Sequence, residues 1–140
     1  MKWMLGLLLG VGCSLFAVEY VDVTAPHGSV RAEIVDTDET RTLGLSNRSS
    51  LDEGNGMLFN FKKPQKVYIW MKDMQFSIDV IWLDRSKIVT FIEKNFSPET
   101  YTKKPPKSIC SPKPDTMYVL EIPAGDAARL GIKMGSQLRF

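Results

Sequence analysis

Residues 67–84 read VYIWMKDMQFSIDVIWLD and place two apolar runs on either side of a short charged turn. The first run, residues 67–71, is continuously apolar, which is typical of a strand buried on both faces. The second run alternates, so that Ile78, Val80 and Trp82 share one face while Asp79, Ile81 and Leu83 share the other. The pattern predicts a central hairpin in which Trp70 and Trp82 both belong to the core.

The flanking sequence predicts further short strands and little helix. A hairpin is expected over residues 19–35, because two β-branched runs surround the turn signal Pro26-His27-Gly28. A short helix capped by Asp36 or Thr37 follows at residues 38–46, and a second is expected at residues 126–130. Further strands are expected at residues 57–61, 88–92, 117–122 and 135–140. Residues 95–115 contain five prolines and four lysines and predict a long irregular loop.

These elements predict a mainly β, β-rich α+β fold. We expect a small antiparallel barrel or sandwich of about eight short strands with two short helices. The length of 140 residues leaves room for one domain. The formal charge of +2 is too small to favour a nucleic-acid binder or polybasic docking to a membrane.

The first seventeen residues have the composition of a secretory signal peptide. Lys2 precedes an uncharged apolar run that is too short to span a bilayer, and Ala17 is a small residue at a suitable cleavage position. We therefore expect a mature domain over residues 18–140. Two alternatives remain open: Cys13 becomes the lipidated first residue of a lipoprotein, or the leader stays uncleaved as an anchor. Cleavage after Ala17 leaves Cys110 as a single thiol, without an internal disulfide.

The sequence contains few residues that suggest catalysis. His27 is the only histidine and lies in a predicted turn, and neither a phosphate loop nor a nucleophile elbow is present. The charged residues near the central turn, with two upstream arginines, are the best candidates for a small polar pocket. The predicted ligand-binding residues are Arg41, Arg48, Trp70, Lys72, Asp73 and Asp79. No metal ligand, cofactor or catalytic residue is assigned.

Four other interpretations of the same residues stay open. Asp79 on a partly apolar face needs a partner, and an ion pair with Arg41 or Arg48 would make it structural. A small charged pocket using Lys72 and Asp79 would suit an enzyme. Met71 and Met74 have the thioether spacing of a Cu(I) site in a copper-handling protein. A hydrolytic carboxylate pair, drawn from Asp73, Asp79, Glu93 and Glu121, cannot be placed from sequence.

Several motifs in order resemble the DUF192 family, also called UPF0127. They are Arg41-x-x-Gly44-Leu45 with Arg48, Gly56-Met57-Leu58-Phe59-x-Phe61, Trp70-Met71-Lys72-Asp73, Asp79-x-x-x-Leu83-Asp84, and Tyr118-Val119-Leu120-Glu121-Ile122-Pro123-Ala124-Gly125 with Leu130-Gly131-Ile132-Lys133-x-Gly135. The sequence departs from the family pattern at Ser46, Asp73, Met74 and Ser77. The resemblance implies a compact, mainly β domain that is often exported, and it supplies no activity because the family has none assigned.

Taken together, the sequence predicts an exported, periplasmic accessory domain that binds a ligand near residues 70–79. The expected partner is a small molecule, a peptide or an envelope protein, and not a nucleic acid. Membrane attachment is expected only through a lipidated Cys13 or an uncleaved leader.

Overall fold

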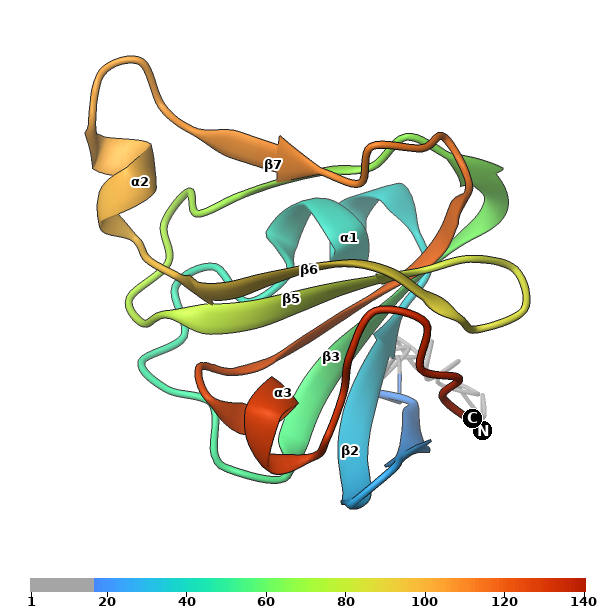
Figure 1. The fold of residues 1–140 in the computed structure, drawn as a ribbon. Coiled ribbons are helices and arrows are strands. Elements are labelled where there is room, and N and C mark those ends of the chain that lie inside the picture. Colours follow the sequence, from blue (N-terminus) through green and yellow to red (C-terminus); the bar gives the residue numbers. More distant parts are fainter. Residues whose placement is uncertain (1–16) are drawn as a thin grey trace, which may run out of the picture.

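The computed structural model describes residues 17–140 as one six-stranded sheet, a separate two-stranded sheet and three short helices (Figure 1). The predicted leader and Cys13 lie outside the described residues. The strands are β1 (Tyr20–Ala25), β2 (Gly28–Val35), β3 (Asn55–Gln65), β4 (Tyr68–Trp70), β5 (Ile78–Leu83), β6 (Val89–Phe96), β7 (Ser108–Cys110) and β8 (Thr116–Pro123). The helices are α1 (Asp38–Leu43), α2 (Glu99–Thr102) and α3 (Asp126–Arg129). The predicted mainly β class is confirmed.

The large sheet has the strand order β1-β2-β3-β8-β5-β6 and is not closed into a barrel. All neighbouring strands are antiparallel except β2 and β3, which pair in parallel after the chain crosses through α1. The predicted hairpin β1–β2 is confirmed, and β5 and β6, each predicted as a strand, also pair as a hairpin. The predicted C-terminal strand is absent, because residues 137 and 139 make only isolated bridges to Ile88 and Thr24.

The central hairpin predicted for residues 67–84 is wrong. Strand β4 pairs with β7, so residues 95–115 contribute a strand and the helix α2 where sequence predicted only a loop. In β4 the residues alternate, with Ile69 buried and Tyr68 and Trp70 exposed. The apolar run therefore has one buried face rather than two, and Trp70 is 55% exposed instead of lying in the core.

Two hydrophobic clusters lie on opposite faces of the large sheet, because successive side chains of a strand point to opposite faces. In β8, Leu120 and Ile122 belong to the first cluster and Val119 to the second. The first face is covered by α3 and the C-terminal segment, whose Leu130 and Leu138 join that cluster. The second face is covered by the turn after α1 and by β4, whose buried residues join the other cluster. Central strands with apolar residues on both faces anchor the whole molecule.

Helix α1 is shorter than the sequence suggested. Thr37 caps its N-terminus as predicted, with its hydroxyl accepting a hydrogen bond from the backbone N–H of Thr40 at 3.1 Å. The helix ends at Leu43 rather than Ser46, because Gly44 adopts a φ of +49° and interrupts the helical geometry. The chain then turns so that Leu45 is buried against the second cluster. Within residues 17–140, no helix is long and apolar enough to cross a membrane.

Candidate functional site

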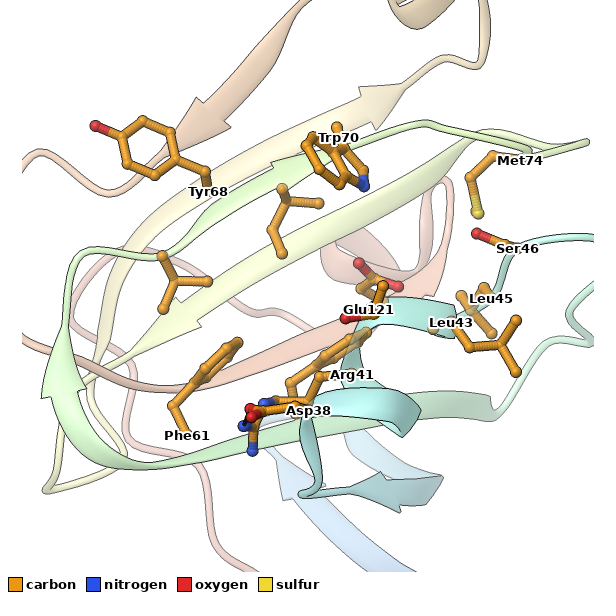
Figure 2. Close-up of a pocket in the computed structure, with 15 residues that line it drawn as sticks. Asp38, Arg41, Leu43, Leu45, Ser46, Phe61, Tyr68, Trp70, Met74 and Glu121 are labelled. Carbon is orange, nitrogen blue, oxygen red and sulfur yellow. Dashed lines mark hydrogen bonds and ion pairs between the residues drawn. The ribbon is translucent and has the colours of Figure 1, made fainter.

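A cavity of about 250 Å³ lies between the α1 segment and strand β4, on the second face of the large sheet. We call it the α1–β4 cavity. Figure 2 shows its walls, with Trp70 on the β4 side, Leu43 and Leu45 on the α1 side, and Phe61 on β3. Its lining residues are Asp38, Arg41, Thr42, Leu43, Gly44, Leu45, Ser46, Phe59, Phe61, Val67, Tyr68, Ile69, Trp70, Met74 and Glu121.

Glu121 provides a carboxyl group at the floor of the cavity. It lies on the central strand β8 between Met57 of β3 and Val80 of β5, and it is only 5% exposed. Figure 2 places it between Trp70 and the α1 segment. Burial raises the pKa of the Glu121 carboxyl from 4.5 to about 8, because desolvation penalises its charged form. The group is therefore mostly protonated at neutral pH.

Arg41 lines the cavity but its guanidinium is occupied elsewhere. One nitrogen donates to the backbone carbonyls of Asp36 and Asn60, at 2.6 and 2.9 Å, and another pairs with Asp38. The guanidinium also lies 5.2 Å from the centre of the Phe61 ring. Figure 2 shows it beside Asp38 rather than beside Glu121. Arg41 therefore braces α1 against β3, and it leaves the Glu121 carboxyl without a positive partner.

The aromatic walls are held in place by neighbouring rings. Phe59 and Phe61 stack with their ring centres 6.4 Å apart and the planes nearly parallel. Trp70 packs edge-on against Tyr101 at 6.5 Å, which fixes the exposed indole from the side of α2. Such packing keeps the ring faces in position at little further entropic cost on binding.

A second, more open hollow adjoins the cavity. It shares Asp38, Thr42, Leu43, Ser46 and Trp70 with the α1–β4 cavity, and adds Glu39, Asn47, Lys72 and Asp73. Two predicted site residues, Lys72 and Asp73, thus share a hollow with Trp70, whereas Arg41 lines only the α1–β4 cavity. Arg48 lines neither hollow and pairs with Glu33 at 2.9 Å.

Asp79 lies on the opposite face of the sheet and lines neither hollow. The sequence correctly placed it on the strand face opposite Trp82, but its expected pairing with Arg41 or Arg48 is wrong. Its buried carboxylate instead accepts hydrogen bonds from the backbone N–H groups of Asn95, Gly125 and Ala127, at 2.9 to 3.0 Å. The side chain joins the first turn of α3 to the end of β6.

The structure does not bring together the residues that the enzyme and copper interpretations require. Lys72 and Asp79 do not meet in one pocket, because they lie by different faces of the sheet. Met74 lines the α1–β4 cavity, whereas Met71 is buried in the second hydrophobic cluster and lines neither hollow. Across residues 17–140, no group of three or more His, Cys, Asp or Glu side chains is arranged to hold a metal ion. Cys110 is a free, half-buried thiol on β7.

Sequence reasoning did not select Glu121 as a binding residue, although it weighed the residue as a hydrolytic carboxylate. The signal was a single charge in the middle of the apolar run at residues 117–122. Such a charge is rare in a central strand and indicates either a buried partner or a site. The aromatic residues Phe59, Phe61 and Tyr68 were interpreted only as strand residues.

The family model DUF192, described as "Uncharacterized ACR", matches residues 21–140. The chain belongs to the DUF192 family. Among its motif residues, seven also line the α1–β4 cavity: Arg41, Gly44, Leu45, Phe59, Phe61, Trp70 and Glu121. No protein of curated function matches this DUF192 chain.

Two solved structures resemble this DUF192 protein over nearly its whole length. A protein of unknown function from Novosphingobium aromaticivorans DSM 12444 is 28% identical, with a TM-score of 0.78, and the match covers 91% of this chain and 89% of that one. A protein from Sinorhizobium meliloti 1021, described as a candidate transcription regulator, is 28% identical with a TM-score of 0.75. That match covers 88% of this chain and 93% of that one.

Proposed function

We propose that this DUF192 protein is an exported, non-enzymatic domain that binds a small organic ligand in the α1–β4 cavity. The observation that carries the proposal is the cavity itself, in which a buried, unpaired carboxyl group faces aromatic and aliphatic walls. Mostly apolar walls with a few polar groups at fixed positions are the usual composition of a small-molecule site. The volume of about 250 Å³ lies just below the usual range for drug-sized ligands, so the ligand is small.

Export is supported by the N-terminal sequence, in which Lys2 and an uncharged apolar run precede Ala17. A binding role is favoured over catalysis by the composition of the cavity. Glu121 is the only carboxyl group at its floor, and His27 and Cys110 are not among its lining residues. The other lining carboxylate, Asp38, is paired with Arg41, and the Ser46 hydroxyl donates to the carbonyl of Lys72. A cavity without a free acid–base partner for Glu121 suits recognition better than bond cleavage.

The proposal is tested by a fragment screen using two-dimensional amide NMR spectra of the protein recovered after expression of the full-length chain. We expect small fragments to shift the amide signals of Gly44, Ile69 and Glu121. Thr42→Trp, on an exposed lining residue of α1, should block the cavity and abolish these shifts. Thr102→Trp is the matched control, because Thr102 is an exposed residue of α2 that lines neither hollow, and it should keep them. Shifts that are absent, or that survive Thr42→Trp, would overturn the proposal.

A further inference from the structure

Two of the charged groups that line the α1–β4 cavity pair with each other, and the third has no partner of opposite charge in the part of the chain that the structure describes. Of the three ionisable Asp, Glu or Arg side chains that line it, Asp38 and Arg41 form an ion pair with each other. Burial is the cause of the raised pKa of Glu121, and no opposite charge or hydrogen bond within residues 17–140 offsets it. An ionised carboxylate in such a place is costly, and a cation beside it removes most of that cost.

The walls around Glu121 favour a cation that needs no hydrogen-bond acceptors. Trp70 presents an exposed aromatic ring, and Leu45, Phe59 and Ile69 form an apolar surface. The Phe61 ring already has the Arg41 guanidinium over it. The faces of such rings attract cations, with Trp the strongest. A primary ammonium carries three N–H donors that each need an acceptor. Besides Glu121, the lining side chains that can accept are Asp38, which is paired with Arg41, and the hydroxyls of Thr42, Ser46 and Tyr68. A methylated ammonium carries its charge on an apolar surface instead.

We propose that the α1–β4 cavity binds a small quaternary ammonium compound, with the Glu121 carboxylate as its counter-ion and Trp70 as its aromatic wall. This inference rests on the proposed function, because it names the ligand class of the same site. The cavity carries no other uncompensated charge. Binding therefore neutralises a carboxylate whose ionisation is disfavoured by burial.

Binding of a cation must then compete with protonation of Glu121. The sheet neighbours of Glu121, Met57 and Val80, are uncharged. The α1 segment contributes the Asp38–Arg41 pair, β4 contributes Tyr68, and the adjoining hollow contributes Glu39, Lys72 and Asp73. Below a pKa of about 8 the carboxyl carries a proton that a cation has to displace. The affinity should rise about tenfold per pH unit up to that pKa and then level off.

The experiment is isothermal titration calorimetry of the protein recovered from full-length expression, with choline and its uncharged carbon isostere 3,3-dimethylbutan-1-ol as the two probes. We expect choline to bind at least about tenfold more tightly than the isostere above pH 8. Its affinity should fall by about tenfold or more on going to about pH 6. Both compounds have nearly the same shape, so the comparison isolates the charge.

Two variants test whether the preference for choline depends on Glu121. Glu121→Gln should remove the preference for choline over the isostere and its pH dependence, while leaving binding of the isostere unchanged. Glu93→Gln is the matched control, because Glu93 is a partly buried carboxylate on β6 outside the cavity. It should leave the choline affinity unchanged. If Glu121→Gln fails to fold, the comparison of the two probes on the unmodified protein still decides.

Each other outcome has a defined meaning. Equal binding of both probes, or choline affinity that falls as the pH rises, would show a ligand bound by the neutral acid and would overturn the ammonium inference alone. Binding of neither probe would also overturn it, while the fragment screen judges the proposed function separately. Choline binding that persists in Thr42→Trp would place the ammonium elsewhere and overturn the assignment to this cavity.

Discussion

Glu121 makes the stability of the free protein depend on pH. An acid whose pKa is near 8 when folded and near 4.5 when unfolded binds more protons in the folded state between these values. Its stabilising contribution is therefore fully present below about pH 4.5 and is lost as the pH rises towards 8. At about 1.4 kcal/mol per pKa unit, the loss amounts to a few kcal/mol.

We expect Glu121→Gln to be more stable relative to the unmodified protein at about pH 8 than at about pH 4.5, because the amide has no proton to lose. Urea unfolding at several pH values measures the difference, and subtracting the two proteins cancels the titration of all other groups. A difference in unfolding free energy that does not change with pH would contradict the raised pKa of Glu121.

Asp79 stabilises the fold through both of its carboxylate oxygens, so replacing one of them should lower stability. Asp79→Asn replaces one acceptor oxygen by an N–H donor that faces backbone N–H groups, and should destabilise the fold by about 3 kcal/mol. Asp73→Asn is the matched control at an exposed position with a φ of +57°, which asparagine tolerates, and should change stability by less than about 0.5 kcal/mol. Thermal or urea unfolding measures both. Equal effects would refute the capping role.

Truncation of the two tryptophans in residues 67–84 should lower the free energy of unfolding by very different amounts. Trp82 is fully buried and its indole N–H donates to the carbonyl of Val67 at 3.1 Å, so Trp82→Ala should cost about 3–5 kcal/mol. Trp70→Ala should cost less than about 1 kcal/mol, because that side chain is largely exposed. It should, however, abolish ligand shifts in the NMR screen. A cost for Trp70 that matches Trp82 would show that it belongs to the core.

At the scale of elements, the sequence predicted those strands whose side-chain alternation is set locally. The alternation of Asp79 with its neighbours predicted β5, and the apolar run at residues 88–92 predicted β6, with which β5 pairs. The pairing of β4 with β7 was not predictable, because it joins segments about forty residues apart through a short strand hidden among prolines. Without that pairing the run at residues 67–71 had no available partner except the next strand.

The candidate site was predicted only in part for the same reason. Trp70, Lys72 and Asp73 are near one another in sequence, and Arg41 lines the same cavity as Trp70 because α1 covers the same face. Glu121 comes from β8, and its position opposite Val80 follows from a strand register that no local pattern sets. Asp79, one residue away from Val80, points to the other face.

The small sheet of β4 and β7 should open more readily than the large sheet. It contains three residue pairs, and Tyr68 and Ser108 within it are exposed. Strands β5 and β8 are buried on both faces. Native-state hydrogen exchange should therefore give lower opening free energies for amides of β4 and β7 than for those of β5 and β8. Saturating ligand should slow exchange in β4 selectively. Equal protection of the two sheets would contradict a separate small sheet.

At the scale of the whole molecule, the two faces of the large sheet are covered differently. The face covered by α3 is closed, and Asp79 satisfies the backbone groups at its edge. The other face is covered by the short segments around α1 and β4, which leave a cavity above a central strand. Glu121 thus lies on a central strand of the large sheet, while the walls above it come from peripheral elements. Such an arrangement fixes the ligand-binding group and allows the entrance to vary.

The last prediction concerns the leader and therefore where the whole molecule acts. Expression of the full-length chain in a bacterium should yield a periplasmic protein whose mass corresponds to a chain starting at Val18, because Ala17 suits the signal peptidase. Strand β1 begins at Tyr20, so cleavage there removes no residue of the sheet. Cys13→Ser should leave this mass unchanged. A lipidated mass that Cys13→Ser abolishes would instead show a lipoprotein, and an intact chain retained in the cytoplasm would refute export.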